Sequence, residues 1–188
     1  GFLWIATQDG LNRYDGYNFT VFVNDPQDST TISDNGVYSL LEDKNGFIWV
    51  GTVGGVLNKY DRKKGTFTRY NFTDAIQIEK DSEEKYFDFP LPYSRSSNNS
   101  ITAIAQDENG IFWIGTWGKG LIKFDEAGNK YEYFHYRKDN PRGFNSNRVK
   151  TVLPDSGGIL WVGTLGGGLY KLSAGDKNIT IDKYLHNG

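Results

Sequence analysis

The sequence predicts an all-β fold made of repeated antiparallel sheets, and two observations lead to this prediction. One motif occurs four times, as LWIATQDGLNRYD, IWVGTVGGVLNKYD, FWIGTWGKGLIKFD and LWVGTLGGGLYKLS. Its tryptophans are Trp4, Trp49, Trp113 and Trp161, so successive copies are 45, 64 and 48 residues apart. Each copy also reads as a strand, a glycine-containing loop and a second strand. Self-similarity at this period indicates a repeat architecture.

A turn is predicted before each tryptophan. Asp43, Asp107 and Asp155 each lie six residues before a tryptophan and three residues before a glycine. An aspartate can accept hydrogen bonds from its own turn, and glycine supplies a positive φ. The chain begins with Gly1 at the glycine position of this turn, three residues before Trp4. We therefore expect the first unit to lack its innermost strand.

Runs of β-branched and aromatic residues predict the strands of each unit. In the first two units the expected strands are residues 2–7, 11–14, 18–23, 37–42, 47–52, 57–60 and 66–72. In the last two units they are residues 101–106, 111–116, 121–124, 130–136, 149–153, 159–164, 169–172 and 179–184. No segment has an apolar period of 3.6 residues, so almost no helix is expected.

The step of 64 residues between Trp49 and Trp113 indicates an insertion at residues 73–98. Part of this segment alternates apolar and polar residues, but Pro90 and Pro92 exclude a central strand. We expect a long inserted loop, or such a loop with one short edge strand.

Four strands in about 45 residues are typical of a β-propeller blade. The small and apolar residues on both faces of the W-I-G-T strand fit a sheet that neighbours cover on both sides. The expected fold is a β-propeller fragment of four-stranded antiparallel blades, with three complete blades plus one lacking its innermost strand. Residues 1–188 form this partial propeller, with blades at about 1–23, 36–72, 100–136 and 148–185.

Composition excludes several classes of function. The net charge of −2 gives no basic surface for nucleic acid. No apolar run approaches 18 residues, so no membrane-spanning helix is expected within this segment. The absence of cysteine excludes disulfides and thiolate metal sites. No calcium loop, nucleophile motif or carboxylate pair is placed by the sequence, so we expect neither catalysis nor a metal or cofactor.

The repeats resemble the two-component regulator propeller repeat, whose pattern is roughly D-x-x-G-x-[IL]-W-[IV]-G-T-x-x-G-G-L-x-[KR]-[YF]-D. The resemblance covers nearly the whole chain in four copies, and its motifs are specific. Departures are local: Ala6 and Val56 replace glycines, and Leu172 and Ser173 replace the aromatic residue and the aspartate. The fold prediction does not depend on these positions.

This resemblance implies a function. Such propellers form the periplasmic sensor region of hybrid two-component sensor histidine kinases, which are inner-membrane proteins that respond to glycans or oligosaccharides. The implied partners are an oligosaccharide or other small ligand and the remaining blades of the parent propeller. Open blade faces also allow self-association, and the membrane is reached only through other parts of the parent. The alternatives are a protein-interaction scaffold or a propeller polysaccharide lyase or hydrolase.

Most of the repeated residues are interpreted as structural. The repeated tryptophans recur in register, which favours packing between blades over stacking on sugars. The repeated aspartates and threonines are interpreted as turn and loop residues. This structural set is Trp4, Trp49, Trp113, Trp161, Thr7, Thr52, Thr116, Thr164, Asp43, Asp107 and Asp155.

Residues outside the repeat supply the candidate binding site. Trp117 follows Thr116, where the other copies have Gln8, Val53 and Leu165. A loop tryptophan is a possible sugar platform, or it caps the channel or contacts a neighbouring blade. Ligands prefer concave sites between loops on a rigid scaffold, so we expect a site near the inter-blade loops. The candidates are Trp117, Lys119, Tyr136, Arg137 and Arg142, although a solvated loop also explains the last three.

Overall fold

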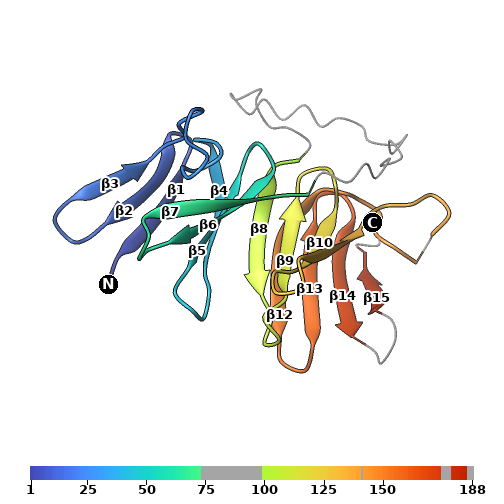
Figure 1. Cartoon of the computed structure of the whole chain (residues 1–188). Helices are drawn as coiled ribbons and strands as arrows, with labels where there is room; N and C mark the ends of the chain where they lie inside the picture. The colour runs from blue at the N-terminus through green and yellow to red at the C-terminus, as the bar shows by residue number, and fades with distance from the viewer. Residues whose placement is uncertain (73–98, 141, 175–178, 186–188) are drawn as a thin grey trace.

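The computed structural model describes residues 1–72, 99–140, 142–174 and 179–185, and all regular structure in these ranges is β-strand (Figure 1). The fold prediction is confirmed, since the strands form antiparallel sheets that follow one another along the chain. The inserted loop predicted at 73–98 lies outside the described residues. No helix in the described part is long and apolar enough to cross a membrane.

The first sheet has three strands and each of the others has four, in chain order. The first two sheets contain β1 (Leu3–Thr7), β2 (Gly10–Tyr14), β3 (Phe19–Phe22), β4 (Val37–Glu42), β5 (Ile48–Thr52), β6 (Val56–Asp61) and β7 (Thr66–Asn71). The third contains β8 (Ile101–Gln106), β9 (Phe112–Thr116), β10 (Leu121–Asp125) and β11 (Lys130–Phe134). The fourth contains β12 (Val149–Asp155), β13 (Ile159–Thr164), β14 (Gly168–Ala174) and β15 (Ile179–Tyr184).

Strands β4, β8 and β12 are the innermost strands, because β8 contacts both of the others. The motif strand of each blade comes next, as β5, β9 and β13. In the first sheet β1 carries the motif and contacts β4 of the second blade, so the described sheet has no strand equivalent to β4. Three complete blades and one blade without an innermost strand are therefore present, as predicted.

Apolar side chains fill the spaces between consecutive blades. One buried cluster joins the first and second blades and includes Leu11 and Tyr60. A second joins the second and third blades and includes Trp49 and Phe112. The third joins the third and fourth blades, with Trp113 packed near the strands of the fourth. Consecutive sheets thus bury their facing sides against each other, which is the packing expected for radially arranged blades.

The aspartates of the turns hold two of the repeated tryptophans. Trp49 Nε1 donates a hydrogen bond to Asp43 Oδ2 at 2.8 Å, and Trp113 Nε1 donates to Asp107 Oδ2 at 3.0 Å. The other oxygen of each carboxylate accepts backbone N–H groups of the turn. Asp155, in the fourth blade, is exposed and accepts hydrogen bonds from Ser156 instead. The fourth turn therefore does not clamp its tryptophan in this way.

The repeated threonines close the loops that follow them. Thr116 Oγ1 donates to the carbonyl of Gly120 at 2.8 Å, and this glycine has a φ of +81°. A Cβ atom at Gly120 would lie 2.3 Å from the carbonyl oxygen of Phe134, so only glycine fits. The same bond recurs from the other three threonines, which are Thr7, Thr52 and Thr164.

Candidate functional site

The antiparallel order of the strands separates the loops into two ends of the fragment. The threonine loops and the connections between blades lie at one end, which we call the loop end. The aspartate turns and the hairpins between the two outer strands of each blade lie at the other, which we call the Asp-turn end. All five candidate ligand-binding residues lie at the loop end.

One backbone hydrogen bond fixes the residue after each threonine at the loop end. The donor is the first loop residue and the acceptor lies just before the innermost strand of the same blade. The pairs are Val53 to Gly36 at 2.9 Å, Trp117 to Ser100 at 2.9 Å and Leu165 to Arg148 at 2.8 Å. The structure thus places Trp117 beside the start of β8, at the inner edge of its blade.

A β-bulge lies at the start of each innermost strand. The register shifts after Val37, Ile101 and Val149, so that one extra residue stands opposite the motif strand in each blade. The extra residues are Tyr38, Thr102 and Lys150. Tyr38 and Lys150 are exposed, whereas the Thr102 hydroxyl donates to the carbonyl of Val149 in the next blade.

Lys150 lies over the ring of Trp117. Its Nζ atom is 4.8 Å from the ring centroid, a distance at which a cation and an aromatic face attract each other. The two residues come from consecutive blades, so this contact joins the third blade to the fourth. It combines an aromatic surface with an ammonium group whose N–H donors can also reach a ligand.

The structure brings together some of the other candidates. Lys119 follows Trp117 in the same loop, and its backbone N–H donates to Thr116 Oγ1 at 2.9 Å. Asn147 ties this loop to the inter-blade connection, since its carbonyl accepts from Gly120 at 2.9 Å and its side chain accepts from the Tyr136 N–H at 2.7 Å. Trp117, Lys119 and Tyr136 therefore belong to one hydrogen-bonded region.

The two arginines are placed differently. Arg137 forms an exposed ion pair with Asp139 at 2.9 Å, and the Arg137 hydrogen bonds lower the pKa of the Asp139 carboxyl group. Arg142 is exposed on the same connection. In the described part of the chain, the cation over Trp117 is Lys150 and neither of these arginines. We call Trp117, Lys119 and Lys150 the Trp117 site.

Sequence reasoning missed Lys150 and Tyr38. A bulge inserts one residue without changing the local composition, so the apolar pattern of the strand does not reveal it. One signal was available: a different residue follows the first apolar residue of each innermost strand, as Val-Tyr, Ile-Thr and Val-Lys. Such a variable position inside an otherwise repeated strand indicates a side chain that is not packed in the core between blades.

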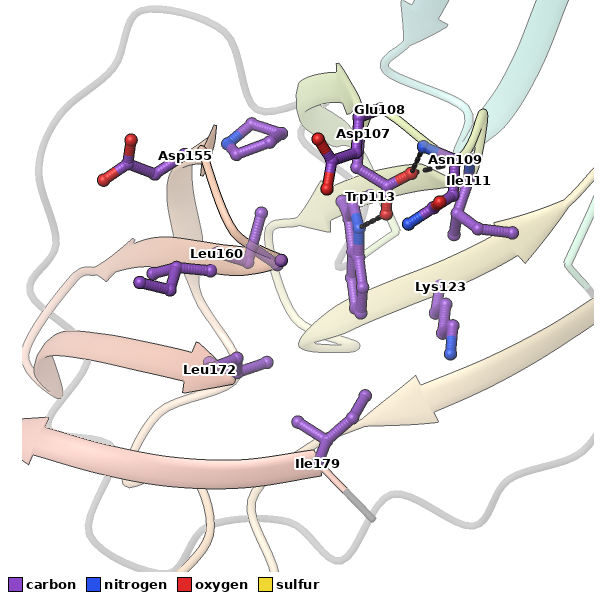
Figure 2. Close-up of a pocket in the computed structure, with 13 residues that line it drawn as sticks. Asp107, Glu108, Asn109, Ile111, Trp113, Lys123, Asp155, Leu160, Leu172 and Ile179 are labelled. Carbon is purple, nitrogen blue, oxygen red and sulfur yellow. Dashed lines mark hydrogen bonds between the residues drawn. The ribbon is translucent and has the colours of Figure 1, made fainter. Parts of the chain in front are cut away.

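A cavity of about 130 Å³ lies at the Asp-turn end, between the third and fourth blades. None of the five predicted ligand-binding residues lines it. Trp113, Lys123, Leu160 and Leu172 form much of its wall (Figure 2). Among the described residues, no cluster of three or more His, Cys, Asp or Glu side chains could hold a metal ion.

A family model described as "Two component regulator propeller" matches residues 31–54, 95–118 and 143–166. Each match runs from an inter-blade connection to the threonine loop and so contains the aspartate turn and the tryptophan. This chain contains repeats of the two-component regulator propeller family. A curated relative, "Histidine kinase P4" of Formosa agariphila, is 54% identical over 33 residues, which are 18% of this chain and 2% of that protein.

Two solved structures resemble this propeller fragment over nearly its whole length. The extracellular domain described for a hybrid two-component system of B. thetaiotaomicron is 26% identical, with a TM-score of 0.74, over 100% of this chain and 24% of that one. Virginiamycin B lyase of Staphylococcus aureus shares the fold alone, with 14% identity and a TM-score of 0.63 over 98% of this chain and 52% of that one. The propeller chain thus spans about a quarter of the hybrid-system domain.

Proposed function

We propose that this chain is a ligand-sensing propeller segment in the extracytoplasmic part of a hybrid two-component receptor. In this proposal the segment lies in the periplasm, as part of the ectodomain of an inner-membrane protein, and performs no catalysis itself. The observation that carries the proposal is the likeness of the entire chain to an extracellular domain described for such a system, with a TM-score of 0.74.

The proposed ligand is a glycan or an oligosaccharide that binds at the Trp117 site. An aromatic ring offers an apolar face to the C–H groups of a sugar ring. The ammonium groups of Lys150 and Lys119 offer donors to sugar hydroxyl or carboxylate oxygens. The Trp117 loop is held by the bonds from Trp117 to Ser100 and from Gly120 to Asn147, so little ordering of the backbone is required on binding.

Signalling in this proposal is a shift of populations. The ligand binds one arrangement of the parent propellers more tightly than another and thereby favours that arrangement. The Lys150–Trp117 contact joins two consecutive blades, so a ligand that competes for the ring changes a contact between blades. Remaining blades of the parent would cover the outer faces of the first and fourth blades.

Calorimetry with the receptor ectodomain and a panel of plant and host oligosaccharides tests the proposal. We expect at least one oligosaccharide to bind, and Trp117→Ala to weaken its binding by about tenfold. The loss of a nucleic-acid base stacked on an aromatic side chain, which costs about 1–3 kcal/mol, gives the scale of this effect. Leu165→Ala is the matched control, because Leu165 occupies the same loop position in the fourth blade. Absence of binding by the whole panel, or equal losses in both variants, would contradict the glycan proposal.

A protein-interaction scaffold is a second candidate, favoured by the apolar residues exposed on the outermost blades. Leu3 and Phe19 of the first blade are 59% and 61% exposed, and Leu153 and Tyr184 of the fourth are 62% and 52% exposed. Exposed apolar patches of this kind mark association surfaces. Sedimentation of the isolated chain tests this candidate: association that rises with concentration supports it, and a monomer at high concentration does not.

A further inference from the structure

Two consecutive blade interfaces can be compared position by position at the Asp-turn end. Trp49 pairs with Lys59 across the second and third strands of its blade, and Trp113 pairs with Lys123 in the same way. Lys59 and Lys123 are therefore equivalent residues. Each faces the blade that follows its own, beside the repeated tryptophan.

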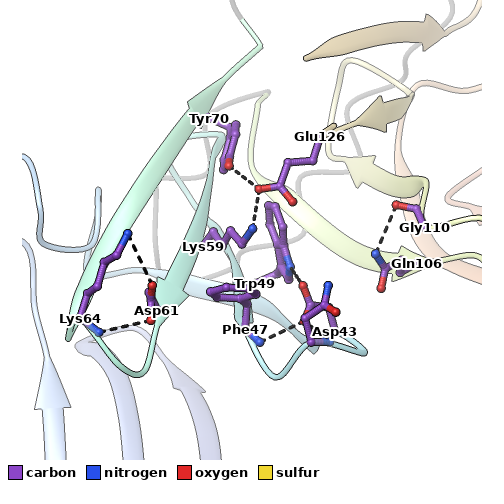
Figure 3. Close-up of polar contacts among 11 residues, drawn as sticks. Asp43, Phe47, Trp49, Lys59, Asp61, Lys64, Tyr70, Gln106, Gly110 and Glu126 are labelled. Atoms are coloured by element: carbon purple, nitrogen blue, oxygen red, sulfur yellow. Dashed lines mark hydrogen bonds and ion pairs between the residues drawn. The ribbon is translucent and has the colours of Figure 1, made fainter. Parts of the chain in front are cut away.

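Lys59 is completely partnered at the interface between the second and third blades. Its Nζ lies 2.5 Å from Glu126 Oε1, and the Tyr70 hydroxyl donates to the same oxygen at 2.6 Å (Figure 3). Nζ also lies 4.1 Å from the ring centroid of Phe47 and 5.1 Å from that of Trp49. The third blade thus supplies a carboxylate to a cation held between rings of the second.

Lys123 lacks each of these partners except the tryptophan. In the aligned repeats Ala174 stands one residue after Ser173, where the third blade has Glu126 after Asp125. Strand register puts Phe134 at the position of Tyr70. Ile111 stands where the second blade has Phe47. Within the described ranges the Lys123 side chain makes no ion pair or hydrogen bond, and its Nζ lies 5.7 Å from the Trp113 ring centroid.

The space beside Lys123 is also left partly empty. Phe112 and Phe124 fill the earlier interface, whereas Leu160 and Leu172 occupy the equivalent positions in the fourth blade. The 130 Å³ cavity lies here, with both leucines and Lys123 in its wall. A cavity of about 150 Å³ in another protein holds benzene, so this one suits about six non-hydrogen atoms.

The two ends of the cavity carry side chains of opposite charge. Glu108 and Asp155 lie at one end of the lining residues, and Lys123 lies with Ile179 toward the other (Figure 2). Asp107 is already engaged, since its carboxylate accepts from Trp113 Nε1 and from two backbone N–H groups. Glu108 and Asp155 are exposed, so water and salt screen them. An anionic group therefore finds its favourable position at the Lys123 end.

We propose that this cavity binds a small carboxylate with an apolar body. The ligand carboxylate pairs with Lys123 and takes the place that Glu126 occupies at the preceding interface. Its apolar part lies against Leu160, Leu172 and the edge of Trp113. The site is separate from the Trp117 site, because it lies at the opposite end of the fragment.

Butyrate is a suitable probe, and butan-1-ol is its neutral counterpart of similar size. NMR titration at constant ionic strength would follow the indole N–H signals of the tryptophans. We expect butyrate to move the Trp113 signal and not that of Trp49, whose interface is filled. Butan-1-ol should bind about tenfold more weakly, because a charged hydrogen-bonded pair is worth more than a neutral contact.

Three variants make the test specific. Lys123→Met keeps the apolar stem and removes the charge, so it should weaken butyrate binding about tenfold. Lys130→Met is the matched control, since Lys130 is exposed on the same blade and does not line the cavity. Ala174→Glu gives the fourth blade the glutamate that the third blade has at position 126, so it should block butyrate. Equal binding of butyrate and butan-1-ol, an unchanged affinity in Lys123→Met, or no movement of the Trp113 signal would overturn the proposal. None of these results depends on oligosaccharide binding at Trp117.

Discussion

The interface between the second and third blades is filled, whereas the interface between the third and fourth is not, although the same motif builds both. Trp49 is fully buried, and its ring lies 4.2 Å from Phe112 and 5.5 Å from Tyr70 between centroids. Among the described residues, Trp113 has a ring contact with Phe134 alone, at 6.0 Å between centroids. The motif therefore fixes the backbone of a blade, and residues around it decide how completely two blades fit.

The polar differences between the two interfaces are coupled. Glu126 accepts hydrogen bonds from both Lys59 and Tyr70 in the filled interface. Where Ala174 removes that acceptor, Phe134 removes the hydroxyl group as well. A half-buried hydroxyl without an acceptor would be costly, so the paired change avoids one unsatisfied group. Among the described residues, Lys123 is then the one member of the set left without a carboxylate partner.

The largest expected effect is that of Trp49→Ala. Removal of a fully buried tryptophan should lower the free energy of unfolding by about 3–5 kcal/mol. Trp161→Ala provides the comparison, because Trp161 is only half-buried on the last blade and contacts Tyr184 at 5.7 Å between ring centroids. We expect a loss of about 1 kcal/mol there. Urea unfolding of both variants measures the difference, and equal losses would contradict the contrast between a filled interface and an open face.

Exchanging the core residues of the two interfaces should reverse their packing. Phe124→Leu gives the filled interface the leucine found at position 172, and it should cost about 1–2 kcal/mol because a void is created. Leu172→Phe extends a side chain into a space of about 130 Å³. This variant should lose less than about 1 kcal/mol or gain stability, since the added atoms enter an existing cavity. A larger loss in Leu172→Phe than in Phe124→Leu, measured by urea unfolding, would show that the cavity cannot accept the ring.

Removing the shared acceptor should weaken the filled interface by a similar amount. Glu126→Ala leaves Lys59, whose side chain is 18% exposed, without its ion pair, and also leaves the Tyr70 hydroxyl without an acceptor. The expected loss is about 1–2 kcal/mol, larger than for exposed ion pairs. Glu132→Ala is the control, because Glu132 is an exposed residue of the same blade. If Glu126→Ala and Glu132→Ala unfold at the same urea concentration, the buried pair contributes nothing measurable.

Much of the fold could be predicted from the sequence, because the repeated motif carries its own turn, strand and loop signals. The aspartate turn, the tryptophan strand and the threonine loop recur at fixed spacing, so one correct interpretation applies to every copy. The candidate site was less predictable. Trp117 stood out because it breaks the repeat, but Lys150 depends on a bulge that has no signature in the strand composition. The variable residue after Val149 was the one sequence signal for Lys150, and it does not indicate that the side chain lies over a ring of the preceding blade.

The cavity illustrates the same limit. Its existence follows from leucines at positions 160 and 172, which look as strand-compatible as the phenylalanines at 112 and 124. Only the packing of the blades shows that positions 160 and 172 face the preceding blade. Likewise, Glu126 lies directly after the motif aspartate in a turn, and nothing in its sequence context indicates a partner 67 residues earlier. The repeated motif predicts contacts within one blade. Contacts between blades join residues far apart in the chain, so the motif does not predict them.

The smallest expected effect concerns the ionisation of Tyr70. Burial raises the pKa of its hydroxyl group above the usual value of 10.0, and the hydrogen bond and charge of Glu126 raise it further. Since the folded state holds this proton more tightly than the unfolded state, the contribution of Tyr70 to stability is complete below about pH 10 and is lost as the pH rises through the folded pKa. Tyrosinate absorbance should therefore show a component that ionises late, and Tyr70→Phe should remove one hydroxyl group from it.

A second substitution separates the two causes of this shift. Glu126→Gln removes the charge but keeps the shape, so the pKa of Tyr70 should fall toward its usual value while remaining above it because of burial. Tyr170 is the internal control: burial raises the pKa of its hydroxyl group, which accepts from the backbone N–H of Asn145 at 2.7 Å and has no carboxylate partner among the described residues. Glu126→Gln should leave the Tyr170 titration unchanged. If Tyr70 in this variant ionises as late as in the original protein, the carboxylate of the third blade does not act on it, and the filled interface is held by its rings alone.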